Sequence, residues 1–88
     1  MKIWKHDLKM IDSQDVLIPR GSKILTAQIQ RGELQLWFAC NESENLERRR
    51  VHVVGTGNPM PDNLGEYIST FQLYGGDLVF HVFVEEAA

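Results

Sequence analysis

Hydrophobic and polar residues alternate with a period close to two along most of the chain. In residues 23–30 and 33–40, apolar side chains take every second position, and Arg31 and Gly32 lie between the two segments. Such alternation is typical of β-strands with one buried face, and a two-residue connection containing Gly is typical of a β-hairpin. The pattern therefore predicts an antiparallel hairpin over residues 23–40.

The same reasoning predicts strands through the rest of the chain. Residues 66–73 and 78–85 predict a second hairpin around a Tyr-Gly-Gly-Asp turn. Its last strand is apolar on both faces, so we expect that strand at the centre of a sheet. Less regular apolar patterns predict three more strands, at residues 2–10, 15–19 and 46–54. We therefore expect one all-β domain over residues 1–88, a small antiparallel β-sandwich or partly open barrel of six to seven strands.

Composition and charge exclude several classes of protein. The chain has 88 residues, 12 acidic residues against 9 Lys and Arg, and a net charge of −3. It lacks the basic excess with which general nucleic-acid binders neutralise phosphates. The single cysteine excludes an intramolecular disulfide and a cysteine-based zinc site. Because no apolar run is typical of a signal peptide or a membrane span, we expect a cytoplasmic protein without membrane contact.

A basic run marks the predicted strand 46–54. Alternation brings Arg48, Arg50 and His52 to one face, where same-face neighbours lie about 6.6 Å apart. This spacing would let two guanidinium groups bind a pyrophosphate or acidic side chains. The alternative is a solvated strand face whose arginines pair with the nearby acidic residues Glu42, Glu44 and Glu47.

The basic run leads into an irregular segment rich in Gly and Pro, residues 55–65. At its start, two glycines could turn successive backbone N–H groups toward an anion, and two polar side chains could add donors. The alternative is a plain turn that needs positive φ. No Walker or Rossmann fingerprint is complete here. The candidate loop residues are Gly55, Thr56, Gly57 and Asn58, and Pro59 follows them.

Aromatic and histidine side chains supply further candidates. Trp37 has the parity opposite to the apolar positions around it, so it either faces outward toward a ligand or subunit or packs in a core. Trp37 or Tyr67 could stack on a base. His81 is either a core histidine with a satisfied ring or a ligand contact. The histidines lack metal-ligand spacing, so we expect no metal and no cofactor.

Enzymatic readings find little support in the spacing of polar residues. Ser69, His81 and an aspartate would provide the residue types of a hydrolytic triad, but nothing in the sequence brings them together. We therefore expect no catalytic residues and a protein that is not an enzyme.

Residues 18–25, 54–59 and 78–83 resemble a family of uncharacterised small proteins, classed as a domain of unknown function, found in phages, prophages and bacteria. The similarity runs from about Lys2 to Phe83. Its most specific elements are the Gly-Thr-Gly-x-Pro turn and the terminal strand of Val-aromatic-His-Val-Phe type. The chain departs from the family at three positions, with His, Gly and Trp replaced by Asn58, Ser69 and Phe80.

The resemblance implies a small phage accessory protein of the kind that blunts host defences. The first hypothesis is a non-enzymatic homo-oligomer that sequesters an anionic nucleotide-like signalling ligand, because a chain this small builds only a shallow pocket alone. The second is a protein that inhibits a host defence protein through an acidic surface made by Asp12, Asp15, Glu33, Glu42, Glu44 and Glu47. A structural module of a phage particle is a third.

Overall fold

Alternating apolar side chains give most strands one face to bury, and the computed structural model, which describes residues 1–87, contains seven strands. They are β1 (Lys2–Asp7), β2 (Ser13–Pro19), β3 (Lys23–Gln30), β4 (Glu33–Cys40), β5 (Leu46–Gly55), β6 (Glu66–Leu73) and β7 (Leu78–Val84). A short 3₁₀ turn, η1 (Tyr74–Gly76), joins the last two strands. Both predicted hairpins are confirmed.

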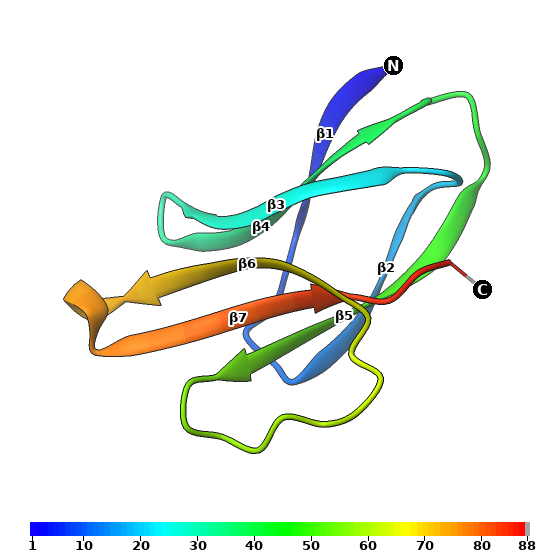
Figure 1. The fold of residues 1–88 in the computed structure, drawn as a ribbon. Coiled ribbons are helices and arrows are strands. Elements are labelled where there is room, and N and C mark those ends of the chain that lie inside the picture. Colours follow the sequence, from blue (N-terminus) through cyan, green and yellow to red (C-terminus); the bar gives the residue numbers. More distant parts are fainter. Residues whose placement is uncertain (88) are drawn as a thin grey trace.

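The strands form two antiparallel sheets that pack face to face (Figure 1). One sheet has the order β1-β4-β3 and the other the order β2-β5-β7-β6. The fold is thus a β-sandwich, as predicted, and the partly open barrel is excluded as a description. Strand β7 lies between β5 and β6, which confirms the central position expected from its two apolar faces.

The first two strands differ from the predicted boundaries because the chain turns earlier than the alternation suggests. Strand β1 ends at Asp7, after which the Leu8 N–H still donates to the Leu34 carbonyl at 3.0 Å. The Gln14 side chain then donates to the Lys9 carbonyl and accepts from its N–H, at 2.7 and 3.0 Å. These bonds stabilise the connection, and β2 begins at residue 13 rather than 15.

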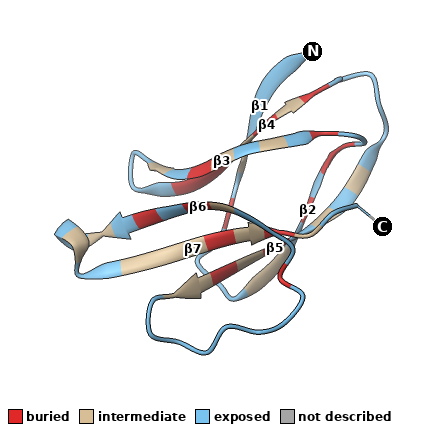
Figure 2. Cartoon of the chain, viewed as in Figure 1, coloured by how far each residue is buried: buried red, intermediate tan, exposed pale blue. Residues whose placement is uncertain are grey.

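The core lies between the two sheets (Figure 2). In β5, Val51 and Val53 are buried while His52, between them, faces outward. Strand β7 contributes Val82 and Val84 in the same way, and Phe38 of the facing sheet is only 2% exposed. The side of the sheet β2-β5-β7-β6 that faces away from this core is called the outer face below.

Two β-bulges shift the alternation away from the predicted parity. The bulge in β3 lies between Ile24 and Thr26, so Leu25 is 41% exposed although regular alternation with the buried Ala27 would place it on the buried face. The bulge in β6 lies between Tyr67 and Ser69, so these two residues occupy opposite faces. Tyr67 therefore reaches the outer face, where its side chain packs edge-on against Phe83 with ring centroids 5.7 Å apart.

The two sheets are joined at their edges by one buried side chain. Ser69 of β6 accepts a hydrogen bond from the Ala27 N–H at 2.9 Å and donates one to the Ala27 carbonyl at 2.6 Å. Ala27 lies in β3, whose far edge pairs with no strand among residues 1–87. Ser69 thus satisfies two backbone groups that the sheet itself leaves unpaired.

The segment 56–65 crosses the outer face of the four-stranded sheet. Strands β5 and β6 are both antiparallel to the β7 strand between them, so they run in the same direction and the connection must return across the sheet. Figure 1 shows this loop on the side away from β1, β3 and β4. Leu64, 6% exposed, anchors it. In the part of the chain that the structure describes, no helix is long and apolar enough to span a membrane.

Candidate functional site

Strand β5 presents the three basic side chains that the alternation predicted on one face. Arg48, Arg50 and His52 lie at alternate positions of the outer face. Arg49, between them, turns to the opposite side, where its guanidinium donates to the Ser22 and Glu85 carbonyls at 3.2 and 3.0 Å. The basic run is therefore two exposed arginines and a histidine in a row, with the middle arginine in a structural role.

Arg48 and Arg50 share one carboxylate, that of Asp15 on the neighbouring strand β2. The distances are 3.6 Å from Arg48 Nε and 3.2 Å from Arg50 Nη1, and both arginine side chains remain at least half exposed. The partner is thus a cross-strand residue and not one of the glutamates near in sequence. A hollow of about 230 Å³ lies beside these arginines and is called the arginine hollow below. It is lined by two cations and three carboxylates: Asp15, Arg48, Arg50, Glu85 and Glu86.

The Gly-Thr-Gly loop uses two of its N–H groups within the fold. The Thr56 N–H donates to the Val79 carbonyl at 2.9 Å, and the Asn58 N–H donates to the Gly55 carbonyl at 3.1 Å. Gly57 has a φ of +91°, in the left-handed region that favours glycine. Because the N–H groups on either side of Gly57 are engaged, the loop does not offer the run of free N–H groups that an anion nest requires.

Thr56 and His81 link the loop to the central strand. Thr56 Oγ1 lies 2.8 Å from His81 Nε2, and His81 Nδ1 lies 2.8 Å from Thr70 Oγ1. Tyr67 Oη extends the chain at 2.7 Å from the Thr70 hydroxyl. His81 lies on the outer face, and both of its ring nitrogens have partners. A ligand could therefore contact this imidazole at a nitrogen only by replacing one of these bonds.

His52 joins two further polar side chains. Its Nδ1 lies 2.8 Å from Ser13 Oγ, and its Nε2 lies 2.5 Å from Glu85 Oε2. Ser13 is the residue directly opposite His52 in the pairing of β2 with β5. The imidazole is mostly buried, with 12% of its side chain exposed, while the Glu85 side chain is 40% exposed. A hydroxyl, an imidazole and a carboxylate thus form one hydrogen-bonded row.

Ser13 and His52 line a hollow of about 280 Å³ between strand β5 and the crossing loop, called the loop hollow below. Its polar groups also include Asp12 and Asn58, and no Lys or Arg lines it. Its apolar walls come from the loop and from β5. The lining residues are Asp12, Ser13, His52, Val53, Val54, Gly55, Asn58, Pro59, Pro61 and Leu64.

The structure has two further hollows. One of about 360 Å³ adjoins the Gly-Thr-Gly loop near Asp77 and Phe80. The other, of about 720 Å³, opens between Met10 and Ile11 of the β1–β2 connection and the β3–β4 turn, and none of the residues expected to bind a ligand lines it. Within residues 1–87, no three His, Cys, Asp or Glu side chains come together as a metal site would require.

The comparisons with known proteins assign a family. A family model described as a domain of unknown function (DUF7352) matches residues 1–88. The chain belongs to this family. No curated protein and no solved structure matches the chain significantly. The resemblance to a domain of unknown function is thereby confirmed over the whole chain, and it carries no activity with it.

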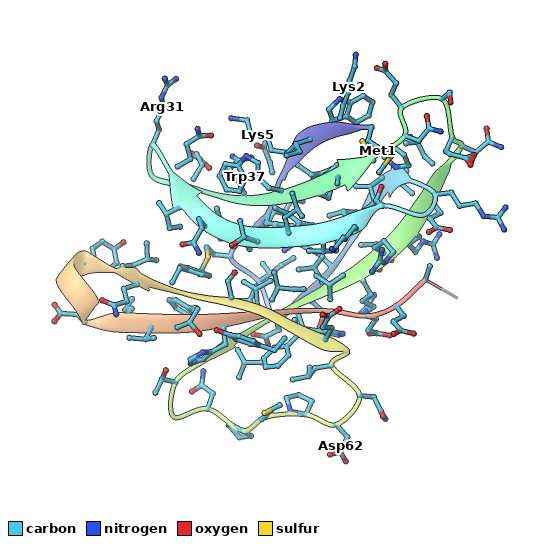
Figure 3. All side chains as sticks on the ribbon, turned by 45° about the horizontal axis from the view of Figure 1, so that its top comes forward. Met1, Lys2, Lys5, Arg31, Trp37 and Asp62 are labelled. Carbon is cyan, nitrogen blue, oxygen red and sulfur yellow. The ribbon has the colours of Figure 1, made fainter. Side chains whose placement is uncertain are left out.

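In this DUF7352 domain the outer face and its loop bring together nearly all the residues expected to bind a ligand. Trp37 is the exception: it pairs in register with Lys5, and Figure 3 shows both on the opposite side of the molecule from Asp62 of the crossing loop. Trp37 is partly exposed, as its parity indicates. The residues found on the outer face or in its loop are Arg48, Arg50, His52, Gly55, Thr56, Gly57, Asn58, Tyr67 and His81.

Sequence reasoning missed three polar residues of this face, and one serine that it weighed lies elsewhere. Ser13, Glu85 and Thr70 contact the two histidines only because neighbouring strands pair in a particular register. Ser69, which we considered as a partner of His81, is instead bonded to Ala27 in the other sheet. No spacing along the chain signals these contacts, because they join residues that are far apart in the sequence.

Proposed function

We propose that this domain binds a small nucleotide-type ligand on the outer face of the four-stranded sheet. The proposal is carried by two neighbouring hollows along β5. His52 lines the loop hollow, and Arg50, the next residue on the same face about 6.6 Å away, lines the arginine hollow. Glu85 of the arginine hollow contacts His52 of the loop hollow at 2.5 Å, so the linings of the two hollows are adjacent. A ligand of mononucleotide size could therefore reach both.

The loop hollow suits the uncharged end of such a ligand. It combines a few hydrogen-bonding groups, from Ser13, His52 and Asn58, with apolar walls from Val54 and Pro59. A mostly apolar lining with a few convergent polar groups is typical of small-molecule sites, and a nucleobase has matching apolar faces and polar edges. Its volume of about 280 Å³ accommodates the base but not a whole dinucleotide.

The arginine hollow suits a phosphate that displaces Asp15. Exposed ion pairs contribute only about 0–1 kcal/mol each, so releasing Arg48 and Arg50 from Asp15 costs little. Guanidinium groups then bind phosphate oxygens through charge-assisted hydrogen bonds. The other carboxylates of this hollow oppose an anion, so the nucleotide should carry few negative charges at this end.

Isothermal titration calorimetry against nucleoside monophosphates, cyclic dinucleotides and ADP-ribose tests the proposal. For a nucleotide that binds, Arg50→Ala should weaken the affinity about 10-fold or more, because charge-assisted hydrogen bonds contribute about 1.5–3 kcal/mol. Asp15→Asn should tighten it by freeing both arginines. The matched control is Arg20→Ala, an exposed arginine in the β2–β3 turn. No binding heat for any nucleotide at high micromolar concentration would overturn the proposal.

The biological setting remains part of the same proposal. A phage-encoded, cytoplasmic protein that holds a nucleotide signal away from host defences would need affinity and abundance, not turnover. A homo-oligomer would deepen a site that one small domain leaves shallow. The alternative role, an acidic surface that inhibits a host protein, receives less support, because some of its acidic residues are already paired with basic side chains. Of its six acidic residues, Asp15 pairs with two arginines and Glu42 pairs with Lys2 at 2.9 Å.

A further inference from the structure

We propose that Ser13 is a nucleophile for short-chain carboxylic esters, with His52 as its general base and Glu85 as the residue that orients the imidazole. The observation is the row of two hydrogen bonds, 2.8 Å from Ser13 Oγ to His52 Nδ1 and 2.5 Å from His52 Nε2 to Glu85 Oε2. The order of hydroxyl, imidazole and carboxylate is that of hydrolases that use a serine nucleophile. The inference does not rest on the proposed nucleotide ligand.

The chemistry of the three groups determines the direction of both hydrogen bonds. An ionised carboxylate only accepts, so in the neutral imidazole Nε2 carries the hydrogen and donates it to Glu85. The Nδ1 atom then has a free lone pair and accepts the hydrogen of the Ser13 hydroxyl. This is the arrangement in which an imidazole can remove the proton of a serine as the serine attacks.

The backbone holds all three residues in place from ordered elements. Ser13 and His52 are paired residues of adjacent strands, and the next N–H along β5, that of Val53, donates to the Asp12 carbonyl at 3.0 Å. Glu85 follows β7, and its N–H donates to the Arg50 carbonyl at 2.9 Å. Residues locked in this way can keep a reactive geometry without a cofactor.

The loop hollow provides the space for a substrate beside the hydroxyl. Ser13 and His52 both line it, together with Asn58, whose side-chain amide can donate a hydrogen bond to a carbonyl oxygen that becomes negative. The walls formed by Val54 and Pro59 are apolar, and the volume of about 280 Å³ accommodates a short acyl group. These features suit a short-chain ester.

The reaction follows from these positions. Ser13 Oγ forms a bond to the ester carbonyl carbon, the π electrons move to the carbonyl oxygen, and the serine proton passes to His52 Nδ1. The carbonyl then re-forms and the bond to the alcohol oxygen breaks, while that oxygen takes the proton from Nδ1. Water repeats the two steps on the acyl-serine, which releases the carboxylic acid and restores Ser13.

The experiment treats the unmodified domain with a fluorophosphonate probe and, separately, with p-nitrophenyl acetate. We expect the probe to add its mass to Ser13, located by peptide mass spectrometry, and the ester to be hydrolysed. Ser13→Ala should remove both signals, and His52→Gln should slow hydrolysis about 100-fold or more. The matched control Ser43→Ala, in the exposed β4–β5 loop, should change neither.

Two results would overturn the inference. One is an unmodified domain that takes up no probe while its unfolding transition shows that it is folded. The other is a probe that labels a different residue. Neither result depends on whether a nucleotide binds, because the labelling is read on the protein alone. A nucleotide detected by calorimetry without any labelling would leave the proposed function intact and remove the hydrolytic role.

Discussion

Gly65 is the position at which the crossing loop tolerates no side chain, and Gly65→Ala should destabilise the domain strongly. Gly65 has a φ of +88°, and a Cβ there would lie 2.4 Å from the Val84 carbonyl oxygen and 2.6 Å from the Glu85 nitrogen. These atoms belong to the backbone at the end of β7, so they cannot move aside as a flexible side chain could. The loop must shift instead, and it carries the buried Leu64 with it.

The magnitude follows from two contributions. An L-residue with a left-handed backbone costs about 1–2 kcal/mol relative to glycine. Loss of the buried position of Leu64, which is 6% exposed, costs about 1.5–3 kcal/mol more. We therefore expect Gly65→Ala to lower the free energy of unfolding by about 2.5–5 kcal/mol. A small domain has only about 5–15 kcal/mol in total, so this is a large fraction of its stability.

Gly57→Ala is the matched control, because it separates backbone strain from the steric contact. Gly57 has a φ of +91°, but a Cβ there would meet no atom within 4 Å. It should cost only the strain of about 1–2 kcal/mol. Urea denaturation followed by tryptophan fluorescence gives the free energy of each variant. Equal destabilisation of the two variants would refute the reasoning, as would a Gly65→Ala domain as stable as the unmodified one.

Three further predictions concern stability and use the same measurement. Ser69→Ala should cost about 2–4 kcal/mol, because it leaves the buried N–H and carbonyl of Ala27 without partners; a loss below 1 kcal/mol would mean that water replaces the hydroxyl. Phe38→Ala should cost about 3–5 kcal/mol by opening a cavity in the core, whereas Trp37→Ala on the far face of the same strand should cost less; equal losses would contradict the assigned faces. Asp15→Asn removes two exposed ion pairs and should change stability by less than about 1 kcal/mol, so a larger loss would show that these pairs are structural.

Strand parity was a good guide wherever a strand was regular. Parity correctly predicted that Arg48, Arg50 and His52 share one face. It also predicted that Trp37 faces away from the buried residues on either side of it in the strand. Parity failed at the bulges, where one extra residue changes the face of everything beyond it. Regular alternation would place Tyr67 on the same face as Ser69, but the bulge between them takes it to the outer face beside Thr70.

The partners of the candidate residues were beyond the reach of sequence reasoning. One of the two interpretations of the arginines paired them with glutamates close in the chain, but they meet Asp15, which strand pairing brings opposite Arg50. The Ser13–His52 contact arises from the same register. A strand shifted by one residue would turn each of these side chains to the other face, and a short-range pattern holds no information about that choice between distant strands.

By itself, the sequence determined the strand-rich class, both hairpins, the central position of β7 and the row of basic residues on β5. These depend on local alternation and on turn residues, which act within a few positions of one another. Only the tertiary structure decided which strands are neighbours, and hence that Ser13, His52 and Glu85 form one hydrogen-bonded row beside the loop hollow. The physical reason is that strand order and register are set by how two whole sheets bury their apolar faces together, a property that no single segment possesses.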